Sequence, residues 1–143
     1  MKLLAAARFT VVSVALLGSI ACGAKTPTEP TPPGPVYELK TETFSGSVAT
    51  GGSKAFPFTV VNPGNIQVGI TELGPTSTLV MGISLGYWEV ATSTCVEQQQ
   101  TTQATINVFF TATPSSPGEY CVGVFDAGNV VVTSDFKLTV THY

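Results

Sequence analysis

Gly82-Ile83-Ser84-Leu85-Gly86 matches the G-x-S-x-G pattern, in which a serine nucleophile lies on a strained turn between a strand and a helix. Asp126 or Asp135, and then His142, follow in the chain order of a serine hydrolase. Apolar residues alternate through this segment, which predicts a continuous strand with no helix behind Ser84. His142 is the only histidine and lies one residue from the end of the sequence, where fraying would leave a general base poorly held. These surroundings do not favour hydrolysis.

Oxygen-bearing side chains near the end of the sequence are candidate calcium ligands. Asp126 and Asn129 are close in sequence, and Asp135 belongs to the next predicted strand. Calcium takes six to eight oxygen ligands, which one or two carboxylates do not supply. Asp126-Ala127-Gly128-Asn129 also has the residue types that a hairpin turn requires at positive φ. We therefore interpret the segment as a turn, keep calcium as a weak alternative, and expect no cofactor.

The three cysteines predict one disulfide. Cys22 ends an export signal and is predicted to carry lipid, which leaves Cys95 and Cys121 as an even pair in an oxidising compartment. Closing the loop between them is worth roughly 3.5 kcal/mol in the chain-entropy model. Zinc is the alternative use of two thiolates, but two ligands without a nearby histidine do not complete a zinc site.

An export signal opens the sequence. Lys2 and Arg8 precede an uncharged stretch, residues 9–21. The stretch is too short to remain as a membrane-spanning helix, but it suits the hydrophobic region of a signal peptide. We therefore predict that residues 1–21 are a cleaved signal peptide.

The last residues of this signal predict a lipid anchor. Ser19-Ile20-Ala21-Cys22 resembles the bacterial lipobox, although serine stands where leucine is usual. Two or three acyl chains on Cys22 would attach the protein stably to a membrane. Because Gly23 is not aspartate, the resemblance implies the outer membrane if the organism has one; the periplasmic or extracellular face of the cell envelope is left open. The alternative is an ordinary secretory peptide cut after Ala21 or Ala24.

Residues 22–36 are predicted to be a proline-rich linker. They contain five prolines and no apolar periodicity. In polyproline II geometry, at about 3.1 Å per residue, they would hold the next domain up to roughly 40 Å from the bilayer.

Charge argues against nucleic acid as a partner. Without residues 1–21 the chain keeps four lysines and nine carboxylates, a formal charge of −5. The lysines are scattered singly and no arginine remains, whereas phosphate contacts require clustered cations. Membrane attachment is therefore expected through the lipid anchor and not through a basic patch.

From residue 37 onward, apolar side chains recur with a period of two, as in strands that bury one face of a sheet. Only 10% of the residues are charged, and a composition rich in Gly, Thr, Ser and Val favours strands over surface helices. The residues predicted to face inward are Ile66, Val68 and Ile70; Leu79, Met81, Ile83, Leu85 and Tyr87; Ile106, Val108 and Phe110; Tyr120, Val122 and Val124; and Phe136, Leu138 and Val140.

Turn residues separate these strands. About eight short strands at regular spacing predict one all-β domain over residues 37–143, a single antiparallel β-sandwich. Pro57 has no amide hydrogen for a ladder bond, so the strand around Phe56 to Val60 should lie at an edge or carry a bulge. The predicted turns are residues 50–53, 62–65, 74–77, 114–118 and 126–129.

Three segments resemble bacterial pre-peptidase C-terminal domains. Residues 43–60, TFSGSVATGGSKAFPFTV, resemble the opening of that family, where an "SG" strand and a turn lead into "F-x-F-T-V". Residues 117–124, PGEYCVGV, resemble its "PG-x-Y-x-V-x-V", and residues 135–140, DFKLTV, resemble its final "Y-x-L-x-V" strand. The resemblance covers residues 40–142 and consists of strand patterns.

The resemblance implies a jelly-roll-like β-sandwich without catalytic activity. In that family such domains accompany secreted proteases, and some bind extracellular matrix, polysaccharide or calcium. The cysteine pair is not general to the family and suggests a lipoprotein subgroup.

Two aromatic residues out of phase with the predicted core are candidate ligand-binding residues. If Val108 and Phe110 point inward, Phe109 must point outward, and Trp88 is likewise out of phase with Tyr87. An exposed ring beside a shallow groove can stack on a sugar or contact a partner protein. The alternative is that Trp88 has left the strand and covers one end of the sandwich.

Three functions are compatible with these features. The first is a lipid-anchored, non-catalytic binding or adhesion module of the cell envelope, with a glycan or a protein as its partner. The second is a structural envelope lipoprotein whose outer face makes self-contacts. The third, the least favoured, is a serine hydrolase that uses Ser84.

Overall fold

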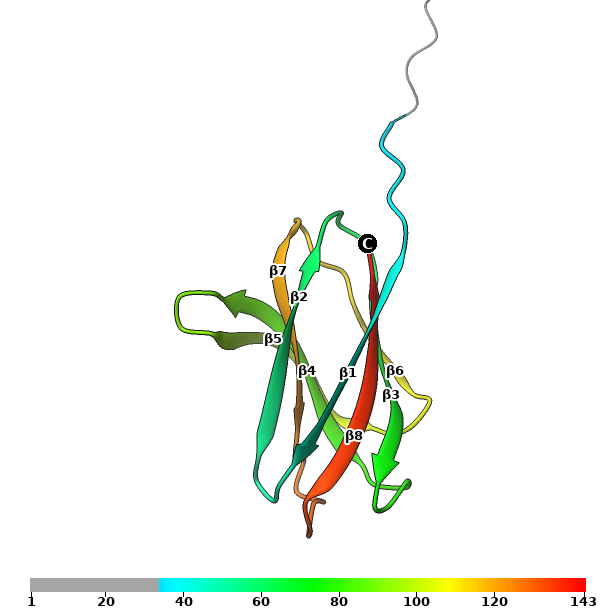
Figure 1. The fold of residues 1–143 in the computed structure, drawn as a ribbon, viewed down its shortest axis with the longest axis vertical. Coiled ribbons are helices and arrows are strands. Elements are labelled where there is room, and N and C mark those ends of the chain that lie inside the picture. Colours follow the sequence, from blue (N-terminus) through cyan, green and yellow to red (C-terminus); the bar gives the residue numbers. More distant parts are fainter. Residues whose placement is uncertain (1–33) are drawn as a thin grey trace, which may run out of the picture. The chain divides into compact units, whose positions relative to one another are not determined.

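The computed structural model describes residues 34–143, and Pro35–Tyr143 form one compact unit (Figure 1). The predicted signal peptide, Cys22 and most of the linker lie outside the described residues. No helix that could cross a bilayer is found in the described part of the chain. The strands, in chain order, are β1 (Lys40–Val48), β2 (Ser53–Val60), β3 (Ile66–Gly74), β4 (Met81–Glu89), β5 (Thr94–Ala104), β6 (Phe109–Ala112), β7 (Gly118–Phe125) and β8 (Ser134–His142).

The eight strands form two antiparallel sheets packed face to face (Figure 1). Sheet A has the order β1-β8-β3-β6, and sheet B has the order β2-β7-β4-β5. Each strand of the first half pairs with its counterpart from the second half: β1 with β8, β2 with β7, β3 with β6, and β4 with β5. A long hairpin wound in this way is a jelly roll. The predicted jelly-roll-like sandwich is confirmed.

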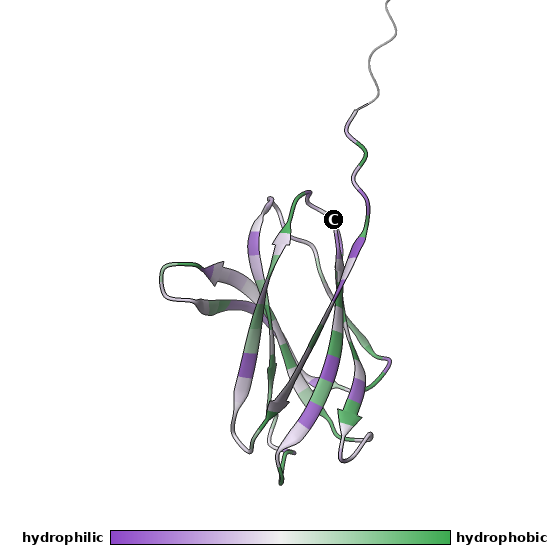
Figure 2. Cartoon of the chain, viewed as in Figure 1, coloured by the Kyte–Doolittle hydropathy of each residue, from purple (hydrophilic) through white to green (hydrophobic). Residues whose placement is uncertain are grey.

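Apolar side chains that alternate along the strands fill the space between the sheets. Hydrophobic and hydrophilic residues follow one another along β8, where burial alternates at every step (Figure 2). Each fully buried aliphatic side chain contributes about 1.5–3 kcal/mol. Those that the sequence predicts to face inward and that are buried here are Ile66, Val68, Ile70, Met81, Ile83, Leu85, Tyr120, Val122, Val124, Phe136, Leu138 and Val140.

Pro57 lies in an edge strand, as predicted. Strand β2 is the first strand of sheet B and pairs only with β7, where Pro57 is opposite Cys121. An edge strand is the place in a sheet where a missing amide hydrogen is tolerated.

Strand β6 begins later than the sequence predicts. Asn107 has a φ of 66°, and the Val108 amide donates to the Thr105 carbonyl oxygen at 3.2 Å. This turn interrupts the alternation, so Val108 is 51% exposed and its predicted inward orientation is wrong. Phe109 does point outward, as predicted, and covers Gly69, where a Cβ would come within 2.7 Å of its ring.

Strand β5 has a polar sequence without apolar alternation, so no strand is predicted there. It spans 11 residues at the other edge of sheet B and pairs with β4. Its register shifts between Leu85 and Gly86, which pair with Gln99 and Glu97 respectively. Gln98 is therefore an extra residue in the strand, a β-bulge.

At Gly86 the backbone of β5 crosses the outer face of β4. A Cβ on Gly86 would overlap the Val96 carbonyl oxygen and lie 2.8 Å from the Cα of Glu97. Beyond this crossing, Cys95 on β5 forms the predicted disulfide with Cys121 on β7, with a Cα–Cα distance of 5.7 Å. Strands on either side of a third strand are separated by about 9.5 Å in a flat sheet. Because β4 lies between them, β5 must fold over β4 for this bond to form.

The disulfide therefore fixes the β4–β5 hairpin, which projects from the body of the domain (Figure 1). We call this hairpin, Tyr87–Glu97, the arm.

Replacing both Cys95 and Cys121 by serine should lower the free energy of unfolding by roughly 3.5 kcal/mol, because the unfolded chain regains the entropy of an open loop. Urea unfolding of the wild type and the double variant measures the difference. A reductant should produce the same loss in the wild type and none in the variant. Equal unfolding midpoints without reductant would contradict the disulfide's stabilising role.

Candidate functional site

Ser84 lies within β4, in the interior of sheet B, and not on a strand-to-helix turn. Its side chain is fully buried on the outer side of the sheet, where its Oγ donates a hydrogen bond to Oε1 of Glu97 at 2.8 Å. A Cβ on Gly123 would overlap the same Oγ. The hydroxyl is therefore enclosed by neighbouring strands and is not presented to solvent as a nucleophile.

His142 belongs to the opposite sheet. It is fully buried in β8, with Nε2 at 3.0 Å from Oε1 of Glu42 and Nδ1 at 3.2 Å from the carbonyl oxygen of Tyr143. The predicted fraying is wrong, because the Tyr143 carbonyl also accepts a hydrogen bond from the Val61 amide at 2.9 Å. Ser84 and His142 thus lie in different sheets and are bonded to different carboxylates. The structure does not assemble the hydrolase triad.

Glu42 links β1 and β8, the first and last strands of the domain. Besides His142, it contacts Nζ of Lys40 at 2.8 Å. Burial raises the pKa of the Glu42 carboxyl, but hydrogen bonds and charge from Lys40 and His142 outweigh this effect and hold the pKa below 4.5. The ionised carboxylate therefore holds β1 against β8.

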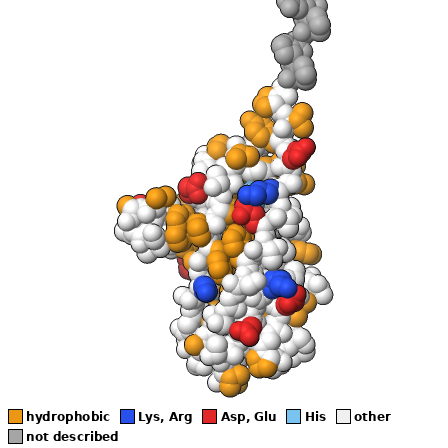
Figure 3. Space-filling model, in the orientation of Figure 1, with side chains coloured by type: hydrophobic (Ala, Val, Ile, Leu, Met, Phe, Trp, Pro, Cys, Tyr) orange, Lys and Arg blue, Asp and Glu red, His pale blue; other side chains and the backbone are white. Residues whose placement is uncertain are grey.

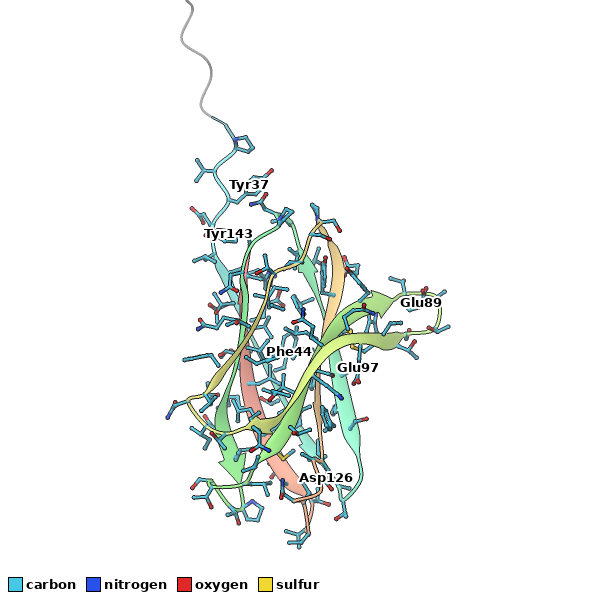
Figure 4. All side chains as sticks on the ribbon, turned by 180° about the vertical axis from the view of Figure 1, so that it is seen from behind. Tyr37, Phe44, Glu89, Glu97, Asp126 and Tyr143 are labelled. Carbon is cyan, nitrogen blue, oxygen red and sulfur yellow. A yellow bond between two sulfur atoms is a disulfide. The ribbon has the colours of Figure 1, made fainter. Side chains whose placement is uncertain are left out.

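The Asp126 carboxylate is a hub of backbone hydrogen bonds. Its Oδ1 accepts from the amides of Gly128 (2.7 Å), Asn129 (2.8 Å) and Val130 (2.9 Å), and its Oδ2 accepts from the Gly51 amide at 2.8 Å. These bonds, led by the one from Gly51, hold the pKa of Asp126 below its ordinary value of 3.8. Asp126 therefore joins the loop that follows β7 to the turn between β1 and β2, and Figure 4 shows it at the end of the domain opposite Tyr143.

The calcium candidates do not form a site. Residues 126–129 do not form the predicted hairpin turn, because they connect β7 of sheet B to β8 of sheet A, and only Gly128 has a positive φ, of 94°. The Asn129 side-chain amide donates to the Val80 carbonyl at 3.1 Å, and Asp135 is exposed on β8. Within residues 34–143, no three His, Cys, Asp or Glu side chains lie close enough together to hold a metal.

Trp88 stays in β4, opposite Cys95, so the alternative that it leaves the strand is wrong. It is half-buried beside a groove of about 330 Å³ on the outer side of sheet B. We call this cavity the Trp88 groove. It is lined by Ser53, Lys54 and Ala55 of β2; Trp88; Ser93, Thr94, Cys95 and Glu97 of the arm; and Gly123, Val124 and Phe125 of β7.

The arm forms one wall of the Trp88 groove. Figure 4 shows Glu97 where the arm meets the body and Glu89 near its far end. The Ser84–Glu97 hydrogen bond and the Cys95–Cys121 disulfide both tie this wall to sheet B. Among the side chains that line the groove, Lys54 and Glu97 supply one charge of each sign.

Phe109 does not belong to the same site as Trp88. It is 56% exposed on β6 of sheet A, whereas Trp88 lies on the outer side of sheet B. The two predicted aromatic residues therefore face opposite sides of the sandwich.

Tyr87 is a residue that the sequence places in the core but that is 44% exposed. It lies on the arm, paired with Val96, beyond the part of β4 that sheet A covers. Tyr87 lines a second cavity together with Gln98 and Gln99. The consecutive glutamines at residues 98–100 are the sequence signal for this cavity. They have no apolar periodicity from which their orientation could be predicted.

No protein-family model matches the chain, and no curated protein matches its sequence. The resemblance to pre-peptidase C-terminal domains therefore remains a prediction from strand motifs.

Replacing Asp126 by asparagine should lower the thermal midpoint by several degrees at pH 7, because an uncharged amide binds the four amides less strongly. Since the pKa of Asp126 is lowered on folding, its stabilisation is present above pH 3.8 and is lost as the pH falls through the folded value. The difference between wild type and variant should therefore shrink in acid. Asp135→Asn, at an exposed carboxylate, is the control. A difference that does not change with pH would contradict this role.

Proposed function

We propose that the protein is a lipid-anchored, non-catalytic module of the bacterial cell envelope that binds a glycan or a protein through the Trp88 groove. The observation that carries the proposal is a half-buried tryptophan beside a groove of about 330 Å³ whose wall is fixed by a disulfide. The anchor rests on the lipobox-like Ser19-Ile20-Ala21-Cys22.

The rigidity of the wall supports binding. Cys95 is bonded to Cys121, and Glu97 accepts a hydrogen bond from the buried Ser84, so the arm has little freedom to lose when a ligand enters. A preorganised site binds more tightly because less conformational entropy is lost. The indole face suits stacking on a sugar ring or an apolar side chain, and Lys54 and Glu97 can orient hydroxyl or amide groups.

The positions of the reactive side chains favour a non-catalytic role. Ser84 is enclosed, His142 is buried in the other sheet, and both oxygens of Asp126 bind backbone amides. A nucleophile and its base must lie within hydrogen-bond reach of each other and of a substrate.

Charge on the surface supports a partner other than nucleic acid. On the face drawn in Figure 3 the lysines lie apart from one another. Lys40 and Lys137 are each paired with a glutamate, Glu42 and Glu72. Paired and separated lysines do not form the continuous positive surface that a phosphate backbone requires.

The free edge of β5 favours the second function, a structural lipoprotein that makes self-contacts. Residues 94–104 form a long edge strand without lysine or proline, the residues that most often protect such edges from pairing with another chain. Sedimentation of the full chain over a range of concentrations separates the two functions. A strict monomer would exclude self-contacts, whereas reversible association without ligand binding would favour them.

Trp88 is the only tryptophan, so its fluorescence reports directly on the Trp88 groove. The full chain, purified in detergent, should bind an envelope glycan on an array or a secreted protein in a pull-down. The emission of Trp88 should shift on binding, and Trp88→Ala should weaken binding about tenfold or more. Phe109→Ala, an exposed aromatic on the opposite side, should bind as the wild type does. Failure to find a binder, or full binding by Trp88→Ala, would contradict the proposal.

A further inference from the structure

We infer that a second binding site lies at the base of the arm, on the side away from the Trp88 groove, and takes one uncharged hydroxylated ring, such as a neutral sugar residue. This site shares no lining residue with the Trp88 groove and goes beyond the function proposed for it. We call it the Tyr87 pocket. It is lined by Ile66, Leu85, Gly86, Tyr87, Gln98, Gln99, Ala112, Thr113, Pro114, Ser115 and Tyr120.

The Tyr87 pocket exists because β4 extends beyond sheet A. Leu85 is 4% exposed, whereas Tyr87, two residues further on the same face, is 44% exposed. Ile66 is the first residue of β3 and Ala112 is the last residue of β6, so sheet A ends at the pocket. The overhanging part of sheet B therefore leaves an aromatic surface that no strand of sheet A covers.

Tyr87 is the exposed ring of this surface, and the ring of Tyr120, which is only 6% exposed, supports it from the core. Tyr87 of β4 is opposite Tyr120 of β7, and their ring centroids are 5.1 Å apart. The Tyr120 hydroxyl donates to the Ser116 carbonyl at 2.8 Å, which holds the loop that supplies Thr113 and Pro114 as a wall. Two faces of the pocket are thus fixed before a ligand arrives.

The volume of the Tyr87 pocket is about 140 Å³. An engineered apolar cavity of roughly 150 Å³ accommodates benzene. The pocket therefore has room for one six-membered ring.

The β-bulge in β5 supplies the polar groups. Because Leu85 pairs with Gln99 and Gly86 pairs with Glu97, the extra residue Gln98 changes the direction of the strand, and both glutamines line the pocket. The Gln98 amide also donates to the Glu97 carbonyl at 3.2 Å, which restricts that side chain. Side-chain amides both donate and accept hydrogen bonds, as sugar hydroxyls require.

The absence of charge in the pocket lining selects against ionised ligands. None of its eleven lining residues is Asp, Glu, Lys, Arg or His. A charge buried without a partner is costly, whereas the C–H face of a neutral sugar can pack on the exposed Tyr87 ring while its hydroxyls reach the amides. A peptide proline also fits aromatic rings, but it has only a carbonyl acceptor and no N–H or O–H donor for the glutamine oxygens.

The test is titration of the full chain in detergent with glucose, galactose and N-acetylglucosamine, followed by calorimetry, with glucuronic acid as the charged counterpart. At least one neutral sugar should bind saturably and glucuronic acid should not. Tyr87→Ala should weaken this binding about tenfold. Gln99→Ala should weaken it less, and both variants should keep the wild-type circular dichroism spectrum, because both side chains are exposed.

Val96→Ala is the matched control, since Val96 is opposite Tyr87 on the arm but does not line the pocket. It should bind sugar as the wild type does. Loss of sugar binding in Trp88→Ala but not in Tyr87→Ala would place the sugar in the Trp88 groove and overturn the inference. The inference is overturned if no neutral sugar binds, if Tyr87→Ala binds normally, or if a proline-rich peptide saturates the pocket and the sugars do not.

Discussion

The absence of a side chain at Gly86 is the constraint on which the rest of this structure depends. It allows the carbonyl of Val96 and the backbone of Glu97 to occupy the space where a Cβ would lie. Only then can β5 cross the outer face of β4 and bring Cys95 to Cys121. The crossing turns an ordinary edge hairpin into an arm with Trp88 on one side and Tyr87 on the other.

The same close packing accounts for the hydrolase-like motif in β4. The glycines on either side of Ser84 are both sites of close approach: the Phe125 ring covers Gly82, and β5 covers Gly86. The outer face of an antiparallel sheet usually meets water, but here its small residues are buried beneath the neighbouring strand and an aromatic ring. The G-x-S-x-G pattern is therefore explained by the close packing of the Phe125 ring and of β5 against the outer face of β4.

Sequence reasoning succeeded where a residue's environment is decided locally and failed where it is decided by distant partners. Period-two alternation predicted the core of β3, β4, β7 and β8, cysteine parity predicted the disulfide, and Pro57 predicted an edge strand. Strand β5 was not predicted, because its sequence has no apolar alternation and its extended conformation is stabilised by backbone pairing with β4. The prediction that His142 frays was wrong, because its hydrogen-bond partner Glu42 is 100 positions away in the sequence and could not be recognised. Trp88 was predicted beside a groove, but the other residues of that groove and the whole Tyr87 pocket could not be predicted, since they depend on how β5 folds over β4.

The most direct test of this account is the replacement of Gly86 by alanine, followed by hydrogen–deuterium exchange of the full chain. The added methyl group cannot fit beneath Val96, so the amides of residues 94–104 should lose protection while β3 and β8 keep theirs. Gly74→Ala adds the same methyl group where nothing lies within 4 Å and should leave exchange unchanged. Wild-type protection of β5 in Gly86→Ala would contradict the claim that the arm depends on this contact.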